Sequence, residues 1–461
     1  MTLLGAKLAA ARAAGAVSRR AGRGGTSLPG KLLLRLEPQA VAALGARLPR
    51  GSAVISATNG KTTSAAMAAA ILEHGGRTLV HNRAGANMAG GVAGALLEAA
   101  GRGGAIAGDT GLFEVDEFWL DRLVPQLHPR ALLLGNLFRD QLDRFGELET
   151  IADRWAQVVA AAPGTTLVLN ADDPLIADLG RSRTGTDGVV YFGIEDPAVA
   201  LSGMAHAADS KHCRRCGAPY RYDLVFLGHL GHYHCDACGA TRPAPQVSAQ
   251  RVVLDGLRGA QVTMATPAGT VEVRLPLPGL YNVYNMLGAA ALALSLGAPI
   301  DDVVAGLQTV SPAFGRAESV RLGGCDLLML LVKNPAGANE VLRTLALEDG
   351  DHDVLAVLND NTADGRDISW VWDADFETLA GRLRRVTCSG TRAAEMALRL
   401  KYAGVPEDRL VVQPDLDRAL DAALAGTPPG PGRLIAIPTY TAMLELRRLI
   451  VARGAAGSSF G

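Results

Sequence analysis

Six consecutive residues combine the groups that a phosphate-binding loop needs. A β-type run over 53–57 leads into a tight turn, and an alanine-rich helical stretch follows. Backbone N–H groups at a helix N-terminus attract anions, a lysine there reaches outer phosphates, and the next hydroxyl can bind Mg²⁺. The six residues are Thr58, Asn59, Gly60, Lys61, Thr62 and Thr63. The early glycine of the general motif would fall at Ile55, so the alternative is an ordinary strand–turn–helix with an exposed lysine.

Four cysteines form two C-x-x-C pairs whose separation is typical of a metal site. The pairs are separated by the 18 residues 217–234, which lies within the zinc pattern, and a glycine follows each pair. Four thiolates complete a tetrahedron and leave no open position, so we predict a structural zinc ribbon. Disulfides or idle thiols are the alternative, which a cytoplasmic location disfavours. The predicted ligands are Cys213, Cys216, Cys235 and Cys238.

Acidic residues follow two further β-type runs. Glu114 lies in the run 112–115, and carboxylate oxygens suit Mg²⁺, although an exposed acid is the alternative. The stretch 359–370 reads Asn-Asp-Asn-Thr-Ala-Asp-Gly-Arg-Asp-Ile-Ser-Trp and follows the run 353–358. The carboxyl end of a strand is where α/β proteins build sites. A calcium loop is excluded because Val371 stands where the bidentate Glu is needed, and a plain turn is the remaining alternative.

Composition excludes several classes of function. The 461 residues are enough for two or three domains, and a formal net charge of −1 gives no global attraction to nucleic acid. No run of about 18 apolar residues predicts a membrane span. Lys7 and Arg12 interrupt the apolar N-terminal stretch, which argues against a signal peptide. We therefore expect a cytoplasmic protein with no nucleic-acid partner.

The first 50 residues are strongly basic, with nine Lys or Arg and one acid, a net charge of +8. Residues 3–20 could form a basic amphipathic helix that lies on an anionic membrane surface. The preferred interpretation is an arm that packs on the neighbouring domain, with its charges in solvent.

Hydrophobic patterning predicts two α/β units. β-type runs and helical stretches alternate from 51 to about 195, typical of a parallel sheet covered by helices. Cys, His and Tyr then interrupt the pattern, antiparallel strands are expected over 251–275 and a helix over 282–297, and alternation resumes beyond 320. The predicted divisions are a basic N-terminal arm or helix at 1–50, an ATP-binding domain at 51–318 with the ribbon inserted at about 205–245, and a Rossmann-like α/β domain at 319–461.

The loop around Lys61 resembles that of the Mur ligases and of the folylpolyglutamate synthetases, with Ala57 where these enzymes usually have Gly. Members of this family phosphorylate a substrate carboxylate with ATP, and an amine then attacks the acyl phosphate. The resemblance implies a Mur-ligase-like central domain in which Thr62 and Glu114 hold Mg²⁺. The segment 136–146 also resembles a family motif, with Gln141 in place of the His that serves a second Mg²⁺.

Three further segments carry the same resemblance. Residues 279–285 place Asn282 and Asn285 where the family's asparagines lie near adenine, although helix caps are an alternative. Arg316, in Gly-Arg-Ala-Glu, is implied to contact the nucleotide phosphates. Lys333-Asn334-Pro335 matches a family segment whose preceding Asp, a ribose ligand, is replaced by Leu331.

The ribbon, the segment 333–337 and the acidic loop 359–370 together resemble one branch of the family, the MurT synthetase subunits of lipid II isoglutaminyl synthase. The resemblance implies a heterodimer with a GatD-like glutaminase subunit that docks on the acidic loop. One Asp of the loop would complete a Cys-His-Asp triad with the partner. Asp367 is our choice, with Asp364 second because Gly365 makes Asp364 a turn former. Cys325 and Cys388 read as buried thiols, so the chain shows no glutaminase of its own.

The implied reaction is ATP-dependent amidation of the α-carboxylate of D-glutamate in the lipid II stem peptide, giving D-isoglutamine. It would proceed through an acyl phosphate with ammonia from the partner, with ATP, Mg²⁺ and Zn²⁺ as cofactors, at the inner face of the membrane. Two alternatives remain: a ligase that adds an amino acid, and a P-loop and zinc-ribbon switch that binds nucleic acid. The lost His disfavours the first, and the weakly basic ribbon disfavours the second.

Overall fold

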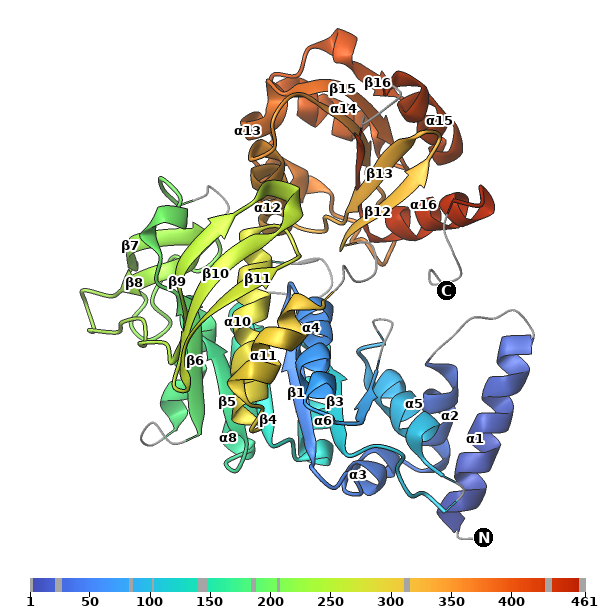
Figure 1. Ribbon diagram of the computed structural model, residues 1–461, viewed down its shortest axis with the longest axis vertical. Helices are drawn as coiled ribbons and strands as arrows, with labels where there is room; N and C mark the ends of the chain where they lie inside the picture. Colours follow the sequence, from blue (N-terminus) through green and yellow to red (C-terminus); the bar gives the residue numbers. More distant parts are fainter. Residues whose placement is uncertain are drawn as a thin grey trace.

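The computed structural model describes residues 3–20, 27–82, 86–101, 103–139, 148–183, 188–204, 208–310, 316–427 and 433–455. Two large sheets lie one above the other in Figure 1, with a small two-stranded sheet to one side of the lower one. Among the described residues, no helix is long and apolar enough to cross a membrane.

The first sheet has nine strands in the order β11-β10-β9-β6-β5-β4-β1-β3-β2. Its strands are β1 (Ser52–Ser56), β2 (Leu79–His81), β3 (Thr110–Glu114), β4 (Ala131–Leu134), β5 (Thr166–Asn170), β6 (Val189–Ile194), β9 (Val247–Leu254), β10 (Ala260–Thr266) and β11 (Gly269–Leu275). β1 pairs in parallel with both β3 and β4, whereas β10 is antiparallel to β9 and β11. The expected antiparallel segment thus extends the parallel sheet, and the whole sheet is mixed.

Helices cover both faces of this sheet, so its central strands are buried on both sides and read as continuous apolar runs. Along β1, Ala53 and Ile55 belong to the core on one face and Val54 to the core on the other. The first face carries α4 (Lys61–His74), α10 (Leu280–Ser295) and α11 (Ile300–Gln308). The second carries α3 (Ala40–Gly45), α5 (Ala89–Ala99), α6 (Leu120–Leu127) and α8 (Leu148–Ala161), and α9 (Pro174–Leu179) follows β5.

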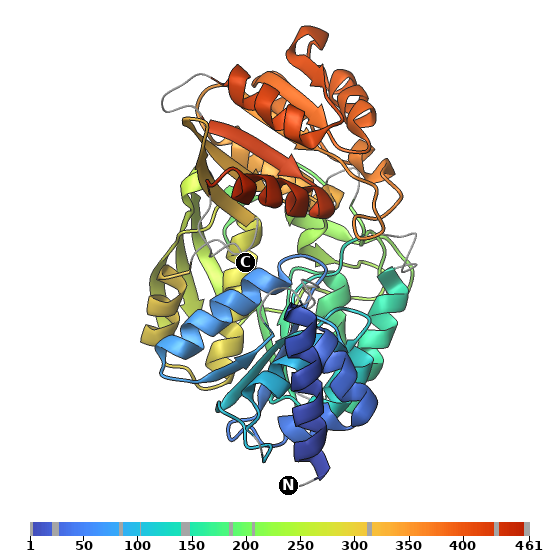
Figure 2. The ribbon, with the colours of Figure 1, turned by 90° about the vertical axis from the view of Figure 1, so that its right-hand side faces the viewer.

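The N-terminal residues form helices that pack on this second face (Figure 2). α1 (Leu3–Arg20) buries Leu8 and Ala11, and α2 (Leu28–Leu36) packs on α5. Lys7 Nζ lies 2.9 Å from Glu37 Oε2, and Arg12 donates to the carbonyls of Leu97 and Ala100. The arm therefore packs on the domain, but these two basic residues contact the protein and do not lie freely in solvent as expected, and contact of α1 with a membrane stays a prediction.

The second large sheet has the order β12-β13-β17-β14-β15-β16. Its strands are β12 (Arg316–Leu322), β13 (Cys325–Leu330), β14 (His352–Val357), β15 (Leu383–Ser389), β16 (Leu410–Val412) and β17 (Arg433–Pro438). One core lies among α12 (Pro335–Ala346), α13 (Glu377–Ala380) and α14 (Ala393–Tyr402), and another among α15 (Leu416–Gly426) and α16 (Tyr440–Ala452). β12 is antiparallel to β13 and begins at Arg316, so this sheet starts three residues before the predicted boundary at 319.

The small sheet is the hairpin of β7 (Arg221–Leu227) and β8 (Leu230–His234). It lies within the segment that interrupts the α/β alternation in the sequence. The four predicted metal ligands flank its open end, and the hairpin lies beside β9 and β10 (Figure 1).

Candidate functional site

The predicted phosphate loop connects the end of β1 to the start of α4. Gly60 lies directly before the helix with a φ of 86°, a left-handed conformation that favours glycine. A Cβ atom at this position would lie 2.0 Å from Asn285 Oδ1, so glycine is also needed sterically. The N–H groups of the first turn of α4 therefore open onto a tight, positively polarised turn, which is an anion-binding arrangement.

Lys61 is the first residue of α4 and is buried. Its Nζ donates to the carbonyl of Ala57 and lies 2.8 Å from Glu117 Oε2. Burial alone would lower the pKa of Lys61, but Glu117, with smaller contributions from Asp116 and Glu114, raises it above its ordinary value. Lys61 therefore stays charged at the helix N-terminus, where a phosphate would be bound.

The two predicted magnesium ligands lie against each other. Thr62 Oγ1 donates to Glu114 Oε1 at 3.1 Å, and the Glu114 side chain is buried at the end of β3. Asn82 fixes the Glu114 backbone, since its Oδ1 accepts from the Glu114 N–H at 2.9 Å and its Nδ2 donates to the Glu114 carbonyl at 2.7 Å. A hydroxyl and a carboxylate beside a phosphate loop are the hard oxygen donors that Mg²⁺ prefers, so this pair fits the ion.

The tip of the loop is clamped by Asn136, which follows β4. Its Oδ1 accepts from the Asn59 N–H at 2.9 Å, and its Nδ2 donates to the Asn59 carbonyl at 3.0 Å. The Phe138 N–H donates to Thr58 Oγ1 at 3.1 Å. Asn136 and Phe138 belong to the segment that resembles a family motif, but the sequence did not indicate this clamp.

The second large sheet reaches the same loop. Lys333 Nζ donates to the Thr58 carbonyl at 3.0 Å. The amides of Asn334 and Asn59 exchange two hydrogen bonds of 3.1 and 3.3 Å, and Asn334 also caps α12 by accepting from the Gly337 N–H. The segment 333–335 therefore connects the two α/β units at the phosphate loop.

The two predicted nucleotide-binding asparagines lie on the first turns of α10. Asn285 Oδ1 accepts from Ser64 Oγ at 3.2 Å, and Asn285 Nδ2 donates to Asn282 Oδ1 at 3.0 Å. Neither residue caps the helix, because α10 begins at Leu280 after Gly279 and has no side-chain cap. The capping alternative is therefore wrong, and Asn285 instead lies beside Gly60.

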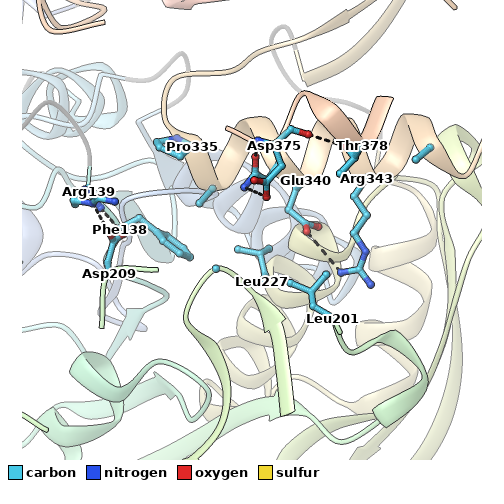
Figure 3. Close-up of a pocket in the computed structure, with 14 residues that line it drawn as sticks. Phe138, Arg139, Leu201, Asp209, Leu227, Pro335, Glu340, Arg343, Asp375 and Thr378 are labelled. Carbon is cyan, nitrogen blue, oxygen red and sulfur yellow. Dashed lines mark hydrogen bonds and ion pairs between the residues drawn. The ribbon is translucent and has the colours of Figure 1, made fainter. Parts of the chain in front are cut away.

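Two adjoining cavities extend from the phosphate loop into the space between the two units. The first, about 90 Å³, begins at Asn59 and Gly60 and is walled by Tyr281, Asn285 and Val341. The second, about 280 Å³, continues to Asp375 and is drawn in Figure 3. The two share the lining residues Phe138, Leu227, Ala336 and Glu340. A phosphate loop that opens into a partly apolar cavity has the form of a nucleotide site.

Glu340 is the buried acid shared by both cavities, and no sequence pattern indicated it. It lies on α12 with its Oε1 3.8 Å from Arg343 Nη1 (Figure 3). Burial raises the pKa of Glu340 to about 7, against the opposing effect of Arg343 and of the backbone N–H groups of Tyr281 and Leu280. Because those N–H groups belong to the first two residues of α10, Glu340 links the second unit to the first.

The two candidate triad residues of the acidic loop differ in exposure. Asp364 is buried and accepts from the Thr441 N–H at 2.7 Å and from the Thr441 hydroxyl, and burial raises its pKa. Asp367 is exposed and accepts from the Ser369 N–H at 2.8 Å, which lowers its pKa. Asp364 thus fixes the loop to α16, while Asp367 remains accessible and ionised.

The four predicted metal ligands lie together at the open end of the β7–β8 hairpin. Their Sγ atoms all lie within 4.8 Å of one another, with 3.6 Å between Cys213 and Cys238 and 3.5 Å between Cys216 and Cys235. The cysteines are free, so the disulfide alternative is wrong. Sulfurs around a tetrahedral Zn²⁺ at ~2.3 Å are separated by about 3.8 Å, so the cluster fits a metal of this kind.

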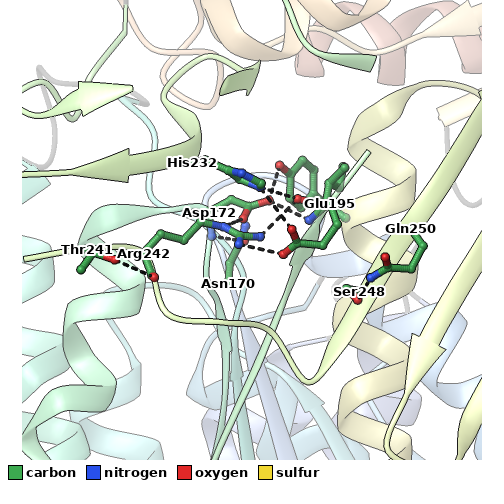
Figure 4. Close-up of polar contacts among 10 residues, drawn as sticks. Asn170, Asp172, Glu195, His232, Thr241, Arg242, Ser248 and Gln250 are labelled. Atoms are coloured by element: carbon green, nitrogen blue, oxygen red, sulfur yellow. Dashed lines mark hydrogen bonds and ion pairs between the residues drawn. The ribbon is translucent and has the colours of Figure 1, made fainter. Parts of the chain in front are cut away.

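A buried polar network anchors the segment after the ribbon to the large sheet (Figure 4). Arg242 donates to Asp172 Oδ1 at 2.6 Å and to Glu195 Oε1 at 2.8 Å. Asp172 also accepts from the Tyr284 hydroxyl at 2.7 Å and from the Ile194 N–H at 2.9 Å. Asp172 therefore joins the ends of β5 and β6 to α10 and to the ribbon.

Two sequence-predicted residues cannot be placed. Gln141 lies outside the described residues, and so does the side chain of Arg316, whose backbone begins β12. Their roles stay predictions.

Comparison with known proteins first defines the class. The Mur ligase middle domain family matches residues 55–234, and the MurT ligase C-terminal family matches 331–443. A solved pseudomurein peptide ligase type C from Methanothermus fervidus superposes with a TM-score of 0.66 over 88% of this chain and 79% of its own, at 22% identity. The fold is therefore that of the Mur-type ligases, with a mixed first sheet and a C-terminal unit.

Curated relatives then define the family. The lipid II isoglutaminyl synthase (glutamine-hydrolyzing) subunit MurT of Staphylococcus aureus N315 is 31% identical over 437 residues, 95% of each chain. The subunit of the same name from Streptococcus pneumoniae R6 is 32% identical over 449 residues, 97% of this chain and 96% of its own. The chain belongs to the MurT family of ATP-dependent ligases.

The raised pKa of Glu340 predicts a pH dependence of stability. The folded pKa of about 7 exceeds the ordinary value of 4.5. Between these two pH values the folded state keeps a proton that the unfolded state loses, so stability falls as pH rises from about 4.5 to 7. Glu340→Gln should flatten this fall by up to about 3 kcal/mol, measured by urea unfolding at pH 5 and pH 7.5. Glu98→Gln, at an exposed position, is the control; equal slopes for wild type and Glu340→Gln would contradict the assignment.

Removing Asp172 should strongly destabilise the first unit. Asp172→Ala leaves the Arg242 side chain, which is only 10% exposed, without its main counterion, and we expect a cost of about 3–5 kcal/mol. The matched control is Asp255→Ala, which breaks a solvent-exposed pair with Arg258 and should cost far less, because water screens such a pair. Equilibrium unfolding of both variants measures the difference, and equal losses would show that the network adds nothing.

Proposed function

We propose that this chain amidates the α-carboxylate of D-glutamate in the stem peptide of lipid II, giving D-isoglutamine, with ammonia released from glutamine by a GatD-like partner. The observation that carries the proposal is the connection of two sites. Lys333 and Asn334 contact the phosphate loop at Thr58 and Asn59, and both also line an 80 Å³ hollow with Asp367. The names of the curated relatives supply the substrate class.

The chemistry is a two-step acyl transfer. A carboxylate oxygen of the substrate attacks the γ-phosphorus of ATP and ADP leaves, which forms an acyl phosphate. Ammonia then attacks the carbonyl carbon, phosphate leaves with the former carboxylate oxygen, and the nitrogen loses a proton. Exclusion of water protects the acyl phosphate, and the contact of Lys333 and Asn334 with the loop provides this closure.

The residues around the phosphate loop would divide the binding of ATP among them. Lys61, fixed in its charged form, and Arg316 neutralise phosphate charge, and the N–H groups that follow Gly60 bind phosphate oxygens. Thr62 and Glu114 would hold Mg²⁺, which offsets the charge of the triphosphate. Tyr281 and Asn285 line the cavity that the nucleoside would enter.

The partner would dock on the acidic loop. Asp367 is exposed and ionised, so its carboxylate can accept a hydrogen bond from a histidine of another chain and hold that ring in the tautomer that a triad needs. Asp364 is occupied by Thr441 and is the second choice. The substrate's lipid tail would place the complex at the cytoplasmic face of the membrane.

Amidation by the isolated chain tests the ligase half. Incubation of lipid II with the chain, ATP, Mg²⁺ and ammonium should convert one carboxylate to an amide, with a mass decrease of about 1 Da seen by mass spectrometry. Lys61→Ala should reduce the rate by at least about 100-fold because it removes a charge from the transition state. Incorporation of an added amino acid instead of ammonia would establish the amino-acid-adding alternative.

Asp367→Asn separates the release of ammonia from glutamine from the ligase reaction. With a GatD-like partner, this variant should lose most glutamine-dependent amidation but keep ammonium-dependent amidation, because the ligase site is intact. Asp364→Asn is the comparison and should instead lower the thermal stability of the second unit. Loss of both activities in Asp367→Asn would contradict the triad assignment.

We further propose that the four cysteines hold one structural Zn²⁺. Elemental analysis of the purified chain should give one zinc per chain, and Cys235→Ser should lose it, because three thiolates leave the tetrahedron open. Cys325→Ser, at a buried thiol outside the cluster, should keep it. A metal content of zero in the wild type would overturn the zinc assignment.

A further inference from the structure

The hairpin that carries the four cysteines has a second end, and that end is buried. Leu227, Gly228, His229 and Leu230 form the turn between β7 and β8. His229 has no exposed surface and Leu230 has 1%. Solvent-exposed turns of hairpins are usually polar and mobile, so this burial requires an explanation.

The turn is inserted against the segment that clamps the phosphate loop. The rings of His229 and Phe138 are 4.8 Å apart, and a Cβ atom on Gly228 would lie 2.9 Å from the Phe138 ring. His229 Nε2 lies 3.5 Å from Asp173 Oδ2, and Asp173 in turn accepts from the Leu137 N–H at 2.9 Å. The turn therefore contacts the strand end from which Asn136 reaches Asn59.

The same turn also walls the cavities of the site. Leu227 and Leu230 line the cavity that begins at Gly60 and Asn285, and Leu227 also lines the larger one (Figure 3). Arg343, on the other side of the larger cavity, donates to the Phe226 carbonyl at 3.0 Å. The hairpin end thus completes the enclosure that the two large sheets leave open.

We propose that this hairpin turn is a wall of the nucleotide pocket, and that metal binding at the four cysteines and nucleotide binding therefore stabilise each other. The inference rests on the proposed nucleotide and zinc sites and adds a coupling between them.

The physical basis is the weakness of a lone hairpin. β7 and β8 pair only with each other, so the hairpin keeps its place through the packing of Phe226, Leu227 and Leu230 in the core of the first sheet and through what fixes its two ends. At the open end, a metal would fix the backbone on both sides of β7 and β8 through Cys216 and Cys235. At the turn, a bound nucleoside would pack on Leu227 and Leu230. When one ligand orders its end of the hairpin, less conformational entropy is lost when the other ligand binds at the opposite end. The two binding events are therefore positively coupled.

Thermodynamic linkage makes the coupling reciprocal, so two independent experiments must agree. The first measures the Kd of a fluorescent ADP analogue, with unlabelled ADP as competitor, for the zinc-loaded chain and for the chain after chelation. Removal of zinc should raise the Kd about tenfold, within the usual range of coupling energies, while circular dichroism shows that both large sheets stay folded. The second measures the zinc affinity by equilibrium competition with a coloured chelator, and saturating ADP should raise this affinity by the same factor.

A pair of variants in the zinc-loaded chain locates the coupling. Leu230→Ala, at the turn, should weaken ADP binding several-fold and keep one zinc per chain. Leu224→Ala, in β7 but outside both cavities, should leave ADP binding unchanged. Equal Kd values with and without zinc, together with a zinc affinity that ADP does not change, would overturn the inference. Failure of the zinc-loaded wild type to bind ADP at all would instead overturn the proposed function, and the inference with it.

Discussion

The backbone of Asn59 is the point on which the site depends. Its N–H and carbonyl are both held by Asn136 of the first sheet, and its side chain exchanges two hydrogen bonds with Asn334 of the second unit. The loop tip lies between β1 and α4, where no strand or helix fixes its backbone, so neighbouring amides have to fix it. The amides do so from both units at once, and this joins the phosphate loop, the cavities and the acidic loop in one assembly.

The charges around the loop follow from the same constraint. Glu114 ends β3, Asp116 and Glu117 follow it, and Lys61 and Lys333 are cations near them. Burial, and then Glu117, raise the pKa of Asp116, whereas the two lysines hold the pKa of Glu117 below its ordinary value despite burial. A triphosphate adds further negative charge to this group of acids, and a divalent cation between Thr62 and Glu114 offsets it.

Local patterns in the sequence were sufficient to predict secondary-structure elements and the candidate site residues at strand ends. The predicted runs 53–57 and 112–115 lie within two residues of β1 and β3. The four cysteines converge because each C-x-x-C pair lies in one short turn. The mixed character of the first sheet was not predicted, because strand order depends on long-range pairing.

Contacts between segments that are distant in the chain could not be predicted from the sequence either. Nothing in the pattern around Glu340 indicates that it meets the start of α10, and nothing around His229 indicates that it lies beneath Phe138. The choice between Asp364 and Asp367 was made from Gly365, and the structure adds a reason that only geometry supplies, the burial of Asp364 against Thr441. Such residues act through packing between units, which leaves no periodic signal.

The central claim is that the chain activates a carboxylate by phosphorylation. Lipid II labelled with ¹⁸O in the α-carboxylate of its D-glutamate tests this claim most directly, in a reaction with ATP, Mg²⁺ and ammonium. We predict that each amide formed is accompanied by one inorganic phosphate that contains ¹⁸O, as read by ³¹P NMR. Unlabelled phosphate, or label in AMP, would contradict an acyl phosphate and with it the account of this site.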